Sequence, residues 1–316
     1  MRRLVALLCL LLAPPVQAEW QHYRWQAMGT EASLEFWHEG DQGKQIHTSI
    51  VNEFARLQAL LSPWIEDSEL ARFNALAANT TMALSPEFYA LLVRSRYYFD
   101  LSHGAFDITF AGAGHLYDYR AGIAPDAVQL SRVVIGMDLL QLEEGGRASK
   151  RDGRLRIDLG GIAKGYAIDR AVALLTEQGV DHAYVSLGGD SHVMGQRGQR
   201  PWQVGIRHPR QDDRIAITLP LADGAVSTSG DYERFFLRDG EPVHHILNPS
   251  TGRPAGEVTS VTVLAPLSVD ADALSTTVFV LGVEKGLALI NTLADTSVII
   301  IDRNGKVHYS DDLFDP

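Results

Sequence analysis

The stretch "RLRIDLGGIAKGYAIDRAVALL", Arg154–Leu175, joins two kinds of local structure. Apolar residues alternate up to Asp158, as is typical of a strand, and the residues after the two glycines have the spacing of an amphipathic helix. An acid, two glycines and Lys164 therefore meet at one predicted strand-to-helix corner. Free backbone N–H groups at a helix start favour an anion, and glycine lets a ligand approach the backbone closely. The corner resembles a phosphate-binding site in these respects.

The corner does not match either common phosphate-binding motif. In the Walker motif the lysine follows the last glycine, whereas here Lys164 precedes Gly165. The glycines at 160, 161 and 165 do not fit the dinucleotide-binding fingerprint either. A simpler explanation is that Asp158 is a helix N-cap before a glycine turn. Lys164 weighs against that explanation, because a cation in the first helical turn is unfavourable unless negative charge lies beside it.

The rest of the chain predicts helices and strands without a strict strand–helix alternation. Helices are predicted at 46–61, 85–102, 162–178, from 268 onward and at 284–293, with Ser85 as the cap and Pro86 as the first residue of the second. Strands are predicted at 31–38, 154–158, 182–187, 202–207, 214–219, 233–237, 243–247, 258–266, 297–301 and 306–310. Asp107 is expected within a strand, and 186–190 and 226–236 are expected to be turns. We therefore predict an α+β fold with largely antiparallel sheets rather than a Rossmann fold.

The first eighteen residues, "MRRLVALLCLLLAPPVQA", have the order of a secretory signal peptide. Two arginines precede an apolar run, and cleavage is expected after Ala18. We expect residues 19–316 to form one domain. No other stretch is expected to be long and uncharged enough to span a bilayer. Because Cys9 is the only cysteine, the mature chain would have no disulfide, thiolate metal site or cysteine nucleophile.

The charge balance excludes several classes of partner. Loss of Arg2 and Arg3 with the signal segment leaves 26 basic and 39 acidic residues, a formal net charge of −13. Such a surface repels nucleic acid and anionic lipid. If a polyphosphate binds here, a metal ion or local backbone donors must overcome that field.

A second candidate site is the segment "DADALSTT", which places Asp272 and Thr276 four residues apart and hence on one helical face. A carboxylate and a hydroxyl in this arrangement suit a hard cation such as magnesium, whereas Asp270 would point elsewhere. The alternative is an acidic first turn that complements the helix dipole, with Thr276 merely buried.

The segment "HHILNPSTGRPA" is predicted to end a strand and turn at Asn248-Pro249, with Gly252 permitting a left-handed bend. His245 is a candidate general base near neutral pH. A structural histidine is the alternative, with His244 as the exposed one. Alternation along the strand places the two on opposite faces, so only one can point into a given cleft.

The order of these motifs is more specific than any one of them. "MGT" at 28–30, "SPWIEDSELARFN" at 62–74, "GAFDIT" at 104–109 and "DLGGIAKGYAID" at 158–169 come first. "SLGGD", "VSTSGDYERFF", "HHILNPSTGRPA" and "ADALSTTVFVLG" follow in sequence. Over essentially the whole mature chain this order resembles the ApbE family, the FAD:protein FMN transferases.

The resemblance implies magnesium-dependent transfer of FMN from FAD to a Ser or Thr hydroxyl of another exported protein, with release of AMP. It implies that His245 is the base and that magnesium is held by the Gly161 carbonyl, Asp272 and Thr276. The residues implied to contact FAD are Met28, Trp64, Ala105, Phe106, Asp107, Asp158, Lys164 and the backbone of Ile246 and Leu247. Family targets are redox subunits of respiratory complexes that carry a Ser/Thr-Gly-Ala-Ser/Thr-like motif, and a periplasmic location is expected.

The chain departs from the family pattern at three places. "FAGAGHLYDYRAG" replaces a segment that usually ends in Trp-Gly, so Tyr117 is expected to stand in for the tryptophan. Asn248 replaces a common Asp, and Ser275 replaces an acid that some members carry before the metal-binding Thr. Two other functions stay open: hydrolysis of FAD to FMN and AMP, and a non-catalytic flavin carrier or assembly factor.

Overall fold

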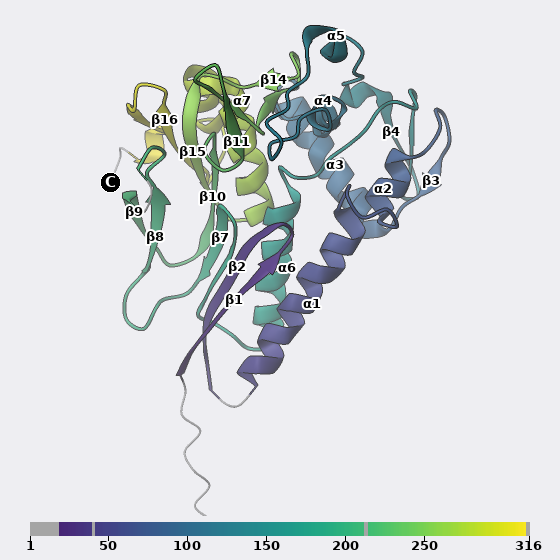
Figure 1. Ribbon diagram of the computed structural model, residues 1–316. Helices are drawn as coiled ribbons and strands as arrows, with labels where there is room; N and C mark the ends of the chain where they lie inside the picture. The colour runs from purple at the N-terminus through teal and green to yellow at the C-terminus, as the bar shows by residue number, and fades with distance from the viewer. Residues whose placement is uncertain (1–18, 40–41, 212–213, 314–316) are drawn as a thin grey trace, which may run out of the picture.

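The chain is described by a computed structural model that covers residues 19–39, 42–211 and 214–313. The predicted signal peptide, residues 1–18 with Cys9, lies outside the described residues. Figure 1 shows a central sheet with long helices on one side and a short hairpin on the other. The predicted α+β class is confirmed.

The central sheet has eight strands, and every neighbouring pair is antiparallel. Its order is β1–β2–β6–β7–β10–β15–β16–β17. The strands are β1 (Glu19–Ala27), β2 (Thr30–His38), β6 (Ala183–Leu187), β7 (Asp190–Met194), β10 (Gly224–Gly230), β15 (Val258–Ala265), β16 (Ser297–Asp302) and β17 (Val307–Tyr309).

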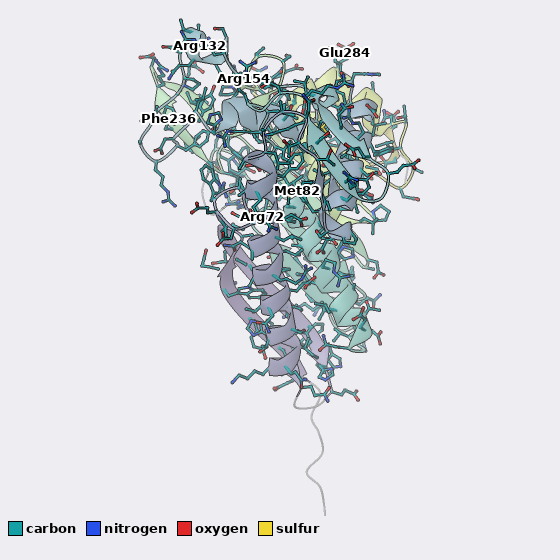
Figure 2. All side chains as sticks on the ribbon, turned by 90° about the vertical axis from the view of Figure 1, so that its right-hand side faces the viewer. Arg72, Met82, Arg132, Arg154, Phe236 and Glu284 are labelled. Carbon is teal, nitrogen blue, oxygen red and sulfur yellow. The ribbon has the colours of Figure 1, made fainter. Side chains whose placement is uncertain are left out.

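Helices α1 (Gly43–Leu61), α6 (Ala163–Glu177) and α7 (Ser268–Ile290) cover one face of this sheet. Figure 2 views the molecule from that side, where α1 and α6 run next to each other. The hairpin of β8 (Trp202–Arg207) and β9 (Ile215–Leu221) covers part of the other face, where Trp202 and Val204 pack against Val193 and Val226. The main hydrophobic core lies between the sheet and the helices.

Smaller elements surround the upper end of these helices in Figure 1. Helices α2 (Glu69–Asn74) and α3 (Pro86–Leu101) follow α1, and Ser85 caps α3 as predicted, because its side chain accepts a hydrogen bond from the Phe88 N–H. The remaining strands are β3 (Met82–Ala83), β4 (Leu140–Glu143), β5 (Arg147–Lys150), β11 (Phe235–Arg238), β12 (Glu241–His244), β13 (Leu247–Asn248) and β14 (Arg253–Pro254). The short helical segments are η1 (Ile108–Phe110), α4 (Ala111–Gly114), α5 (Ala127–Leu130), η2 (Met137–Leu139) and η3 (Asp311–Leu313).

The predicted strand at 154–158 is wrong, although the segment is held in place by hydrogen bonds. The Asn74 side chain bonds both the N–H and the C=O of Ile157, at 2.8 and 2.9 Å. The Asp158 N–H donates to the Ile108 carbonyl at 2.9 Å. An amide side chain thus takes the place of a neighbouring strand, so no ladder forms.

Two further local predictions are wrong. Asp107 lies not in a strand but at the start of η1, where its Oδ1 accepts hydrogen bonds from the Thr109 N–H and hydroxyl. The segment "VSTSG" is not a turn, because Val226–Gly230 belongs to β10 and pairs with β15 on one side and, in part, with β7 on the other.

Helix α7 contains both helices predicted after residue 268, which meet at a kink at Gly282, where φ is +80°. By length and composition α7 could cross a membrane, so the expectation that no such second stretch exists is wrong. About half of an apolar 18-residue stretch of α7 is buried inside the protein, and α7 packs against β10, β15 and α6. These contacts are those of a core helix.

The starts of α6 and α7 lie in direct contact at Gly165. A Cβ on Gly165 would lie 2.8 Å from the Asp272 Cβ and far inside van der Waals contact with the Ser268 carbonyl oxygen. Asp169, one turn further along α6, accepts hydrogen bonds from the N–H groups of Ser268 and Val269 at 2.7 and 2.9 Å and so caps α7. Only glycine at 165 permits this approach of the two helices.

We expect Gly165→Ala to lower the free energy of unfolding by ~1–3 kcal/mol, because the added methyl group meets backbone that cannot rotate away. Urea denaturation followed by circular dichroism measures this change. Thr176→Ala, at an exposed position of the same helix, is the matched control and should change stability little. Equal stability of the two variants would contradict the close packing of α6 on α7.

Candidate active site

The glycine corner before α6 lies against two predicted site residues. A Cβ on Gly161 would lie 3.3 Å from the Thr276 hydroxyl oxygen and 3.4 Å from the Phe106 ring. The Asp158 carboxylate accepts a hydrogen bond from the Gly160 N–H at 2.6 Å. Bare backbone at 161 therefore faces both α7 and the segment that follows α3.

Two buried carboxylates and one ammonium group meet beside this corner. The Gly165 N–H donates to Asp272 Oδ2 at 2.9 Å, and Lys164 Nζ lies 3.2 Å from Asp272 Oδ1. The same ammonium also donates to Oδ2 of Asp190, and each of the two acids is only 2% exposed. Burial and the charge of Asp190 raise the pKa of Asp272. Burial opposes the charge of Lys164, but the two carboxylates outweigh it and raise the pKa of Lys164.

A row of hydroxyl groups connects the two acids. Ser227 donates to Asp190 Oδ1 at 2.5 Å, and Ser227 and Ser229 lie 3.0 and 2.9 Å from the Ser275 hydroxyl. Ser275 in turn donates to the Asp272 carbonyl, and Ser229 lies 3.4 Å from Thr276. Because residues two apart on a strand share a face, β10 presents both serines to α7.

The two adjacent histidines have different environments, as strand alternation predicts. His244 is 2% exposed, its Nε2 bonds the Ala255 carbonyl at 2.8 Å, and its ring packs against Phe279. The alternative in which His244 is the exposed one is therefore wrong. His245 is partly buried, and its Nδ1 is buried without a hydrogen-bond partner among the described residues.

The electrostatic surroundings keep His245 neutral. Burial lowers its pKa to about 3, and the positive charges of Arg234 and Lys164 act in the same direction. The backbone N–H of His245 donates to the backbone carbonyl of Arg234. The two residues therefore lie opposite each other, directly next to the β11–β12 hairpin. Figure 2 shows Phe236, on this hairpin, at the outer edge of the molecule.

The structure places some of the other predicted flavin contacts near Arg234 and His245. Met28, at φ +47°, and Gly29 form the tight turn between β1 and β2, and Arg234 Nη2 lies 3.7 Å from the place of a Gly29 Cβ. Ile246 and Leu247 directly follow His245 and are buried. Ala105 lies beside Phe106, whereas the Asp107 carboxylate is occupied in capping η1. Trp64 is 83% exposed in the loop between α1 and α2, and no described contact joins it to the acids.

The residues that depart from the family pattern are held in local networks. Tyr117 donates to the Gly252 carbonyl at 2.9 Å and thereby supports the turn after Asn248. The Asn248 carbonyl accepts from the N–H groups of Thr251 and Gly252, and φ of Gly252 is +65°, as the predicted left-handed bend requires.

Asp270 points away from Asp272 and Thr276, as predicted, and bonds Arg94 and Tyr98.

Sequence reasoning missed Asp190, Ser227, Ser229 and Arg234 as members of the site. The local evidence for them was the acid directly after the glycines of "SLGGD" and the i, i+2 spacing of the serines in "VSTSG". Within the described ranges, no group of three or more His, Cys, Asp or Glu side chains is arranged as metal ligands. The implied magnesium set has a single carboxylate and would not form such a group.

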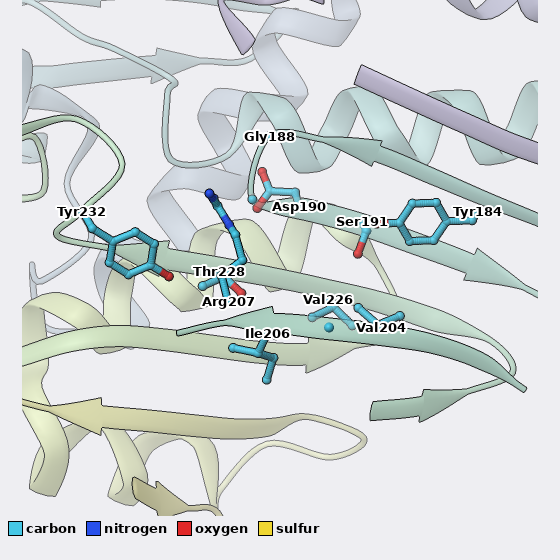
Figure 3. Close-up of a pocket in the computed structure, with 12 residues that line it drawn as sticks. Tyr184, Gly188, Asp190, Ser191, Val204, Ile206, Arg207, Val226, Thr228 and Tyr232 are labelled. Atoms are coloured by element: carbon cyan, nitrogen blue, oxygen red, sulfur yellow. The ribbon is translucent and has the colours of Figure 1, made fainter. Parts of the chain in front are cut away.

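One of two cavities borders Asp190 of the acid pair, and the other lies away from both acids. Figure 3 shows one on the side of β7 that faces the β8–β9 hairpin, with Tyr184, Ser191, Arg207 and Tyr232 in its lining. Its volume of about 90 Å³ is too small for a dinucleotide, since drug-sized ligands occupy ~300–1,000 Å³. The other, of about 350 Å³, lies between β9 and the β16–β17 edge of the sheet.

Comparison with known proteins identifies the family. The ApbE family model matches residues 28–300. The chain belongs to the ApbE family. It is 35% identical to an FAD:protein FMN transferase of Treponema pallidum, covering 86% of this chain and 82% of the relative, and 31% identical to one of Vibrio cholerae, covering 99% and 98%.

Solved ApbE structures have the same fold. The ApbE protein of Thermotoga maritima superimposes with a TM-score of 0.87 at 31% identity, covering 94% of this chain and 98% of that one. The flavin transferase ApbE of Vibrio cholerae gives 0.84 at 30% identity, covering 94% and 99%. The predicted membership of this family of enzymes is confirmed.

We expect the His245 imidazole to stay neutral between pH 5 and 8, because its pKa lies near 3. Titration of the ring ¹H–¹³C resonances by NMR, assigned with His245→Gln, measures this pKa. In the unfolded chain a histidine titrates near pH 6.5, so the folded state loses stability as the pH falls from about 6.5 toward 3. A His245 midpoint near 6.5 in the folded protein would contradict the buried environment.

Proposed function

We propose that this enzyme transfers FMN from FAD to a Ser or Thr hydroxyl of another exported protein and releases AMP. One observation carries the proposal: Gly161, Lys164, Asp272 and Thr276 meet from separate parts of the chain. The names of the relatives support flavin transfer as the reaction class.

The donor set fits magnesium as the metal. A backbone carbonyl, a carboxylate and a hydroxyl are the hard oxygen ligands that this ion prefers. The ammonium group of Lys164 already stands against Asp272, so a positive charge is stabilised at this place. Gly161, Asp272 and Thr276 would hold the ion. When bound, magnesium would screen the charge of the FAD diphosphate and orient it.

In the transfer step the acceptor hydroxyl oxygen forms a bond to the phosphorus of the FMN half of FAD. The bond from that phosphorus to the bridging oxygen breaks, and AMP leaves with that oxygen. His245 takes the hydroxyl proton, for which it is suited because its imidazole is neutral. An anionic diphosphate beside His245 raises the proton affinity of the imidazole and so offsets its low pKa.

The location and the acceptor belong to the same proposal. The order of residues 1–18 supports export, and we propose a periplasmic enzyme whose acceptor is a redox subunit with a Ser/Thr-Gly-Ala-Ser/Thr-like motif. No close match to that motif occurs in the present sequence, which argues against self-modification. Hydrolysis of FAD is the second candidate, because water can replace the hydroxyl at the same centre. The presence of His245, Asp272 and Thr276 argues against a non-catalytic carrier.

We expect His245→Ala to reduce flavin transfer ~10²–10⁴-fold, the usual contribution of a positioned base, while FAD binding is retained. The assay incubates mature protein, FAD, magnesium and a motif-bearing acceptor, and mass spectrometry of the acceptor detects the FMN adduct. His22→Ala, at an exposed position of β1, is the control. Transfer at the parental rate by His245→Ala would exclude His245 as the base, and free FMN and AMP without adduct would select hydrolysis.

We expect Asp272→Ala to abolish magnesium-dependent turnover, because it removes the only carboxylate of the implied metal set. The readout is AMP release across a magnesium titration, with Asp270→Asn as the control because Asp270 faces Arg94 and Tyr98 instead. Undiminished turnover by Asp272→Ala would refute the metal assignment.

A further inference from the structure

Asp190 is a buried carboxylate next to the proposed metal ligands, and the transfer step does not use it. It is held from two sides: Ser227 donates to Oδ1 at 2.5 Å, and Lys164 donates to Oδ2. Its backbone lies in β7, directly opposite Ser227 of β10. The sheet therefore fixes the backbone of Asp190, and Ser227 and Lys164 hold its carboxylate.

The hold of Lys164 on the other acid is weaker. Asp272 Oδ2 is fixed by the Gly165 N–H at 2.9 Å, whereas Asp272 Oδ1 bonds only the Lys164 ammonium, at 3.2 Å, within the described part of the chain. Lys164 is thus shared between a carboxylate that Ser227 also holds and a second carboxylate, that of Asp272, at 3.2 Å. Because opposite charges attract steeply with decreasing distance, the Asp272 contact is the one that a competing cation breaks first.

We propose that Lys164 is the resident counter-ion of Asp272 in the metal-free enzyme, and that Asp190 is its positioning residue. When a divalent cation binds at Asp272, Lys164 releases Asp272 Oδ1 and stays on Asp190, from where it faces the diphosphate. This inference rests on the proposed metal assignment. It explains why a buried acid with no place in the ligand set lies so close to the centre.

The arrangement also explains how the centre survives without metal. Two carboxylates buried together repel each other, and burial of an unpaired charge is unfavourable. A single ammonium between them offsets both costs. When a metal ion takes the place of Lys164 at Asp272, one cation replaces another. The carboxylates of Asp190 and Asp272 are therefore paired with a positive charge throughout the exchange.

The test is calorimetric titration with Mg²⁺ alone, without FAD, of the wild type, Lys164→Met, Asp190→Asn and the control Asp270→Asn. Because Lys164 competes with the metal, Lys164→Met should bind Mg²⁺ about tenfold more tightly and melt several degrees lower without metal. Magnesium should restore its melting temperature. Asp190→Asn, in which Lys164 has only Asp272 to bond, should bind Mg²⁺ about tenfold more weakly.

A crystal structure of the wild type with Mg²⁺ tests the position of Lys164 directly. We expect Lys164 Nζ to remain on Asp190 and to lie beyond hydrogen-bond distance of Asp272 Oδ1. A lysine that still bridges both acids, or one that leaves Asp190, overturns the proposal. Equal Mg²⁺ affinities in the wild type and the variants overturn it too but leave flavin transfer standing, whereas no Mg²⁺ binding by the wild type removes the metal centre itself.

Discussion

The close approach of α6 to α7 at Gly165 is the constraint on which the candidate site depends. The absence of a side chain at 165 lets the first turn of α6 lie against Ser268 and Asp272. The backbone N–H of Gly165 then binds the Asp272 carboxylate at 2.9 Å. A free N–H group at a helix start is a natural partner for an anion. The same contact therefore packs the helices, satisfies a helix end and places the acid beside Lys164 and Gly161.

The central sheet supplies the remaining polar side chains of the site. Strand β10 presents Ser227 and Ser229 toward α7, and β7 presents Asp190 from the neighbouring strand. Their hydroxyl and carboxylate groups form one connected network with Ser275 and Thr276 of α7. Networks of this kind in a buried setting hold their members rigidly, because each unpaired polar group would be costly. The network thus links β7, β10 and α7 around the site.

Local patterns in the sequence predict the elements that depend on local physics. The cap and proline at Ser85-Pro86 predicted the start of α3, and the apolar spacing after Gly161 predicted α6. Strand β10 was missed because its "VSTSG" run has little contrast between apolar and polar positions. The alternating pattern at 154–158 predicts a strand that does not form. The backbone of this segment bonds the side chain of Asn74 instead, a partner that no local pattern shows.

Some residues of the candidate site can likewise be predicted from local sequence, whereas others depend on the tertiary fold. Asp272 and Thr276 share a helical face, which spacing alone predicts, and family resemblance joins them to Gly161. The place of Asp190 depends on the order of β7 and β10 in the sheet, and that of Arg234 on the path of the chain into the β11–β12 hairpin. Such contacts arise from the tertiary fold. They could not be derived from residues 186–190 or 226–236 taken by themselves.

The charges at the centre also bear on how an acidic protein binds an anionic dinucleotide. With both acids ionised, Lys164, Asp190 and Asp272 together carry one net negative charge. A diphosphate that approached this group would be repelled, and the acidic surface of the protein would add to the repulsion. Arg234, near the β1–β2 turn, supplies one positive charge at the margin. In the proposed mechanism, a divalent cation at Asp272 would make the centre positive and free Lys164 from one of its two carboxylates. Attraction would then replace repulsion at the place where the phosphoryl group must be held.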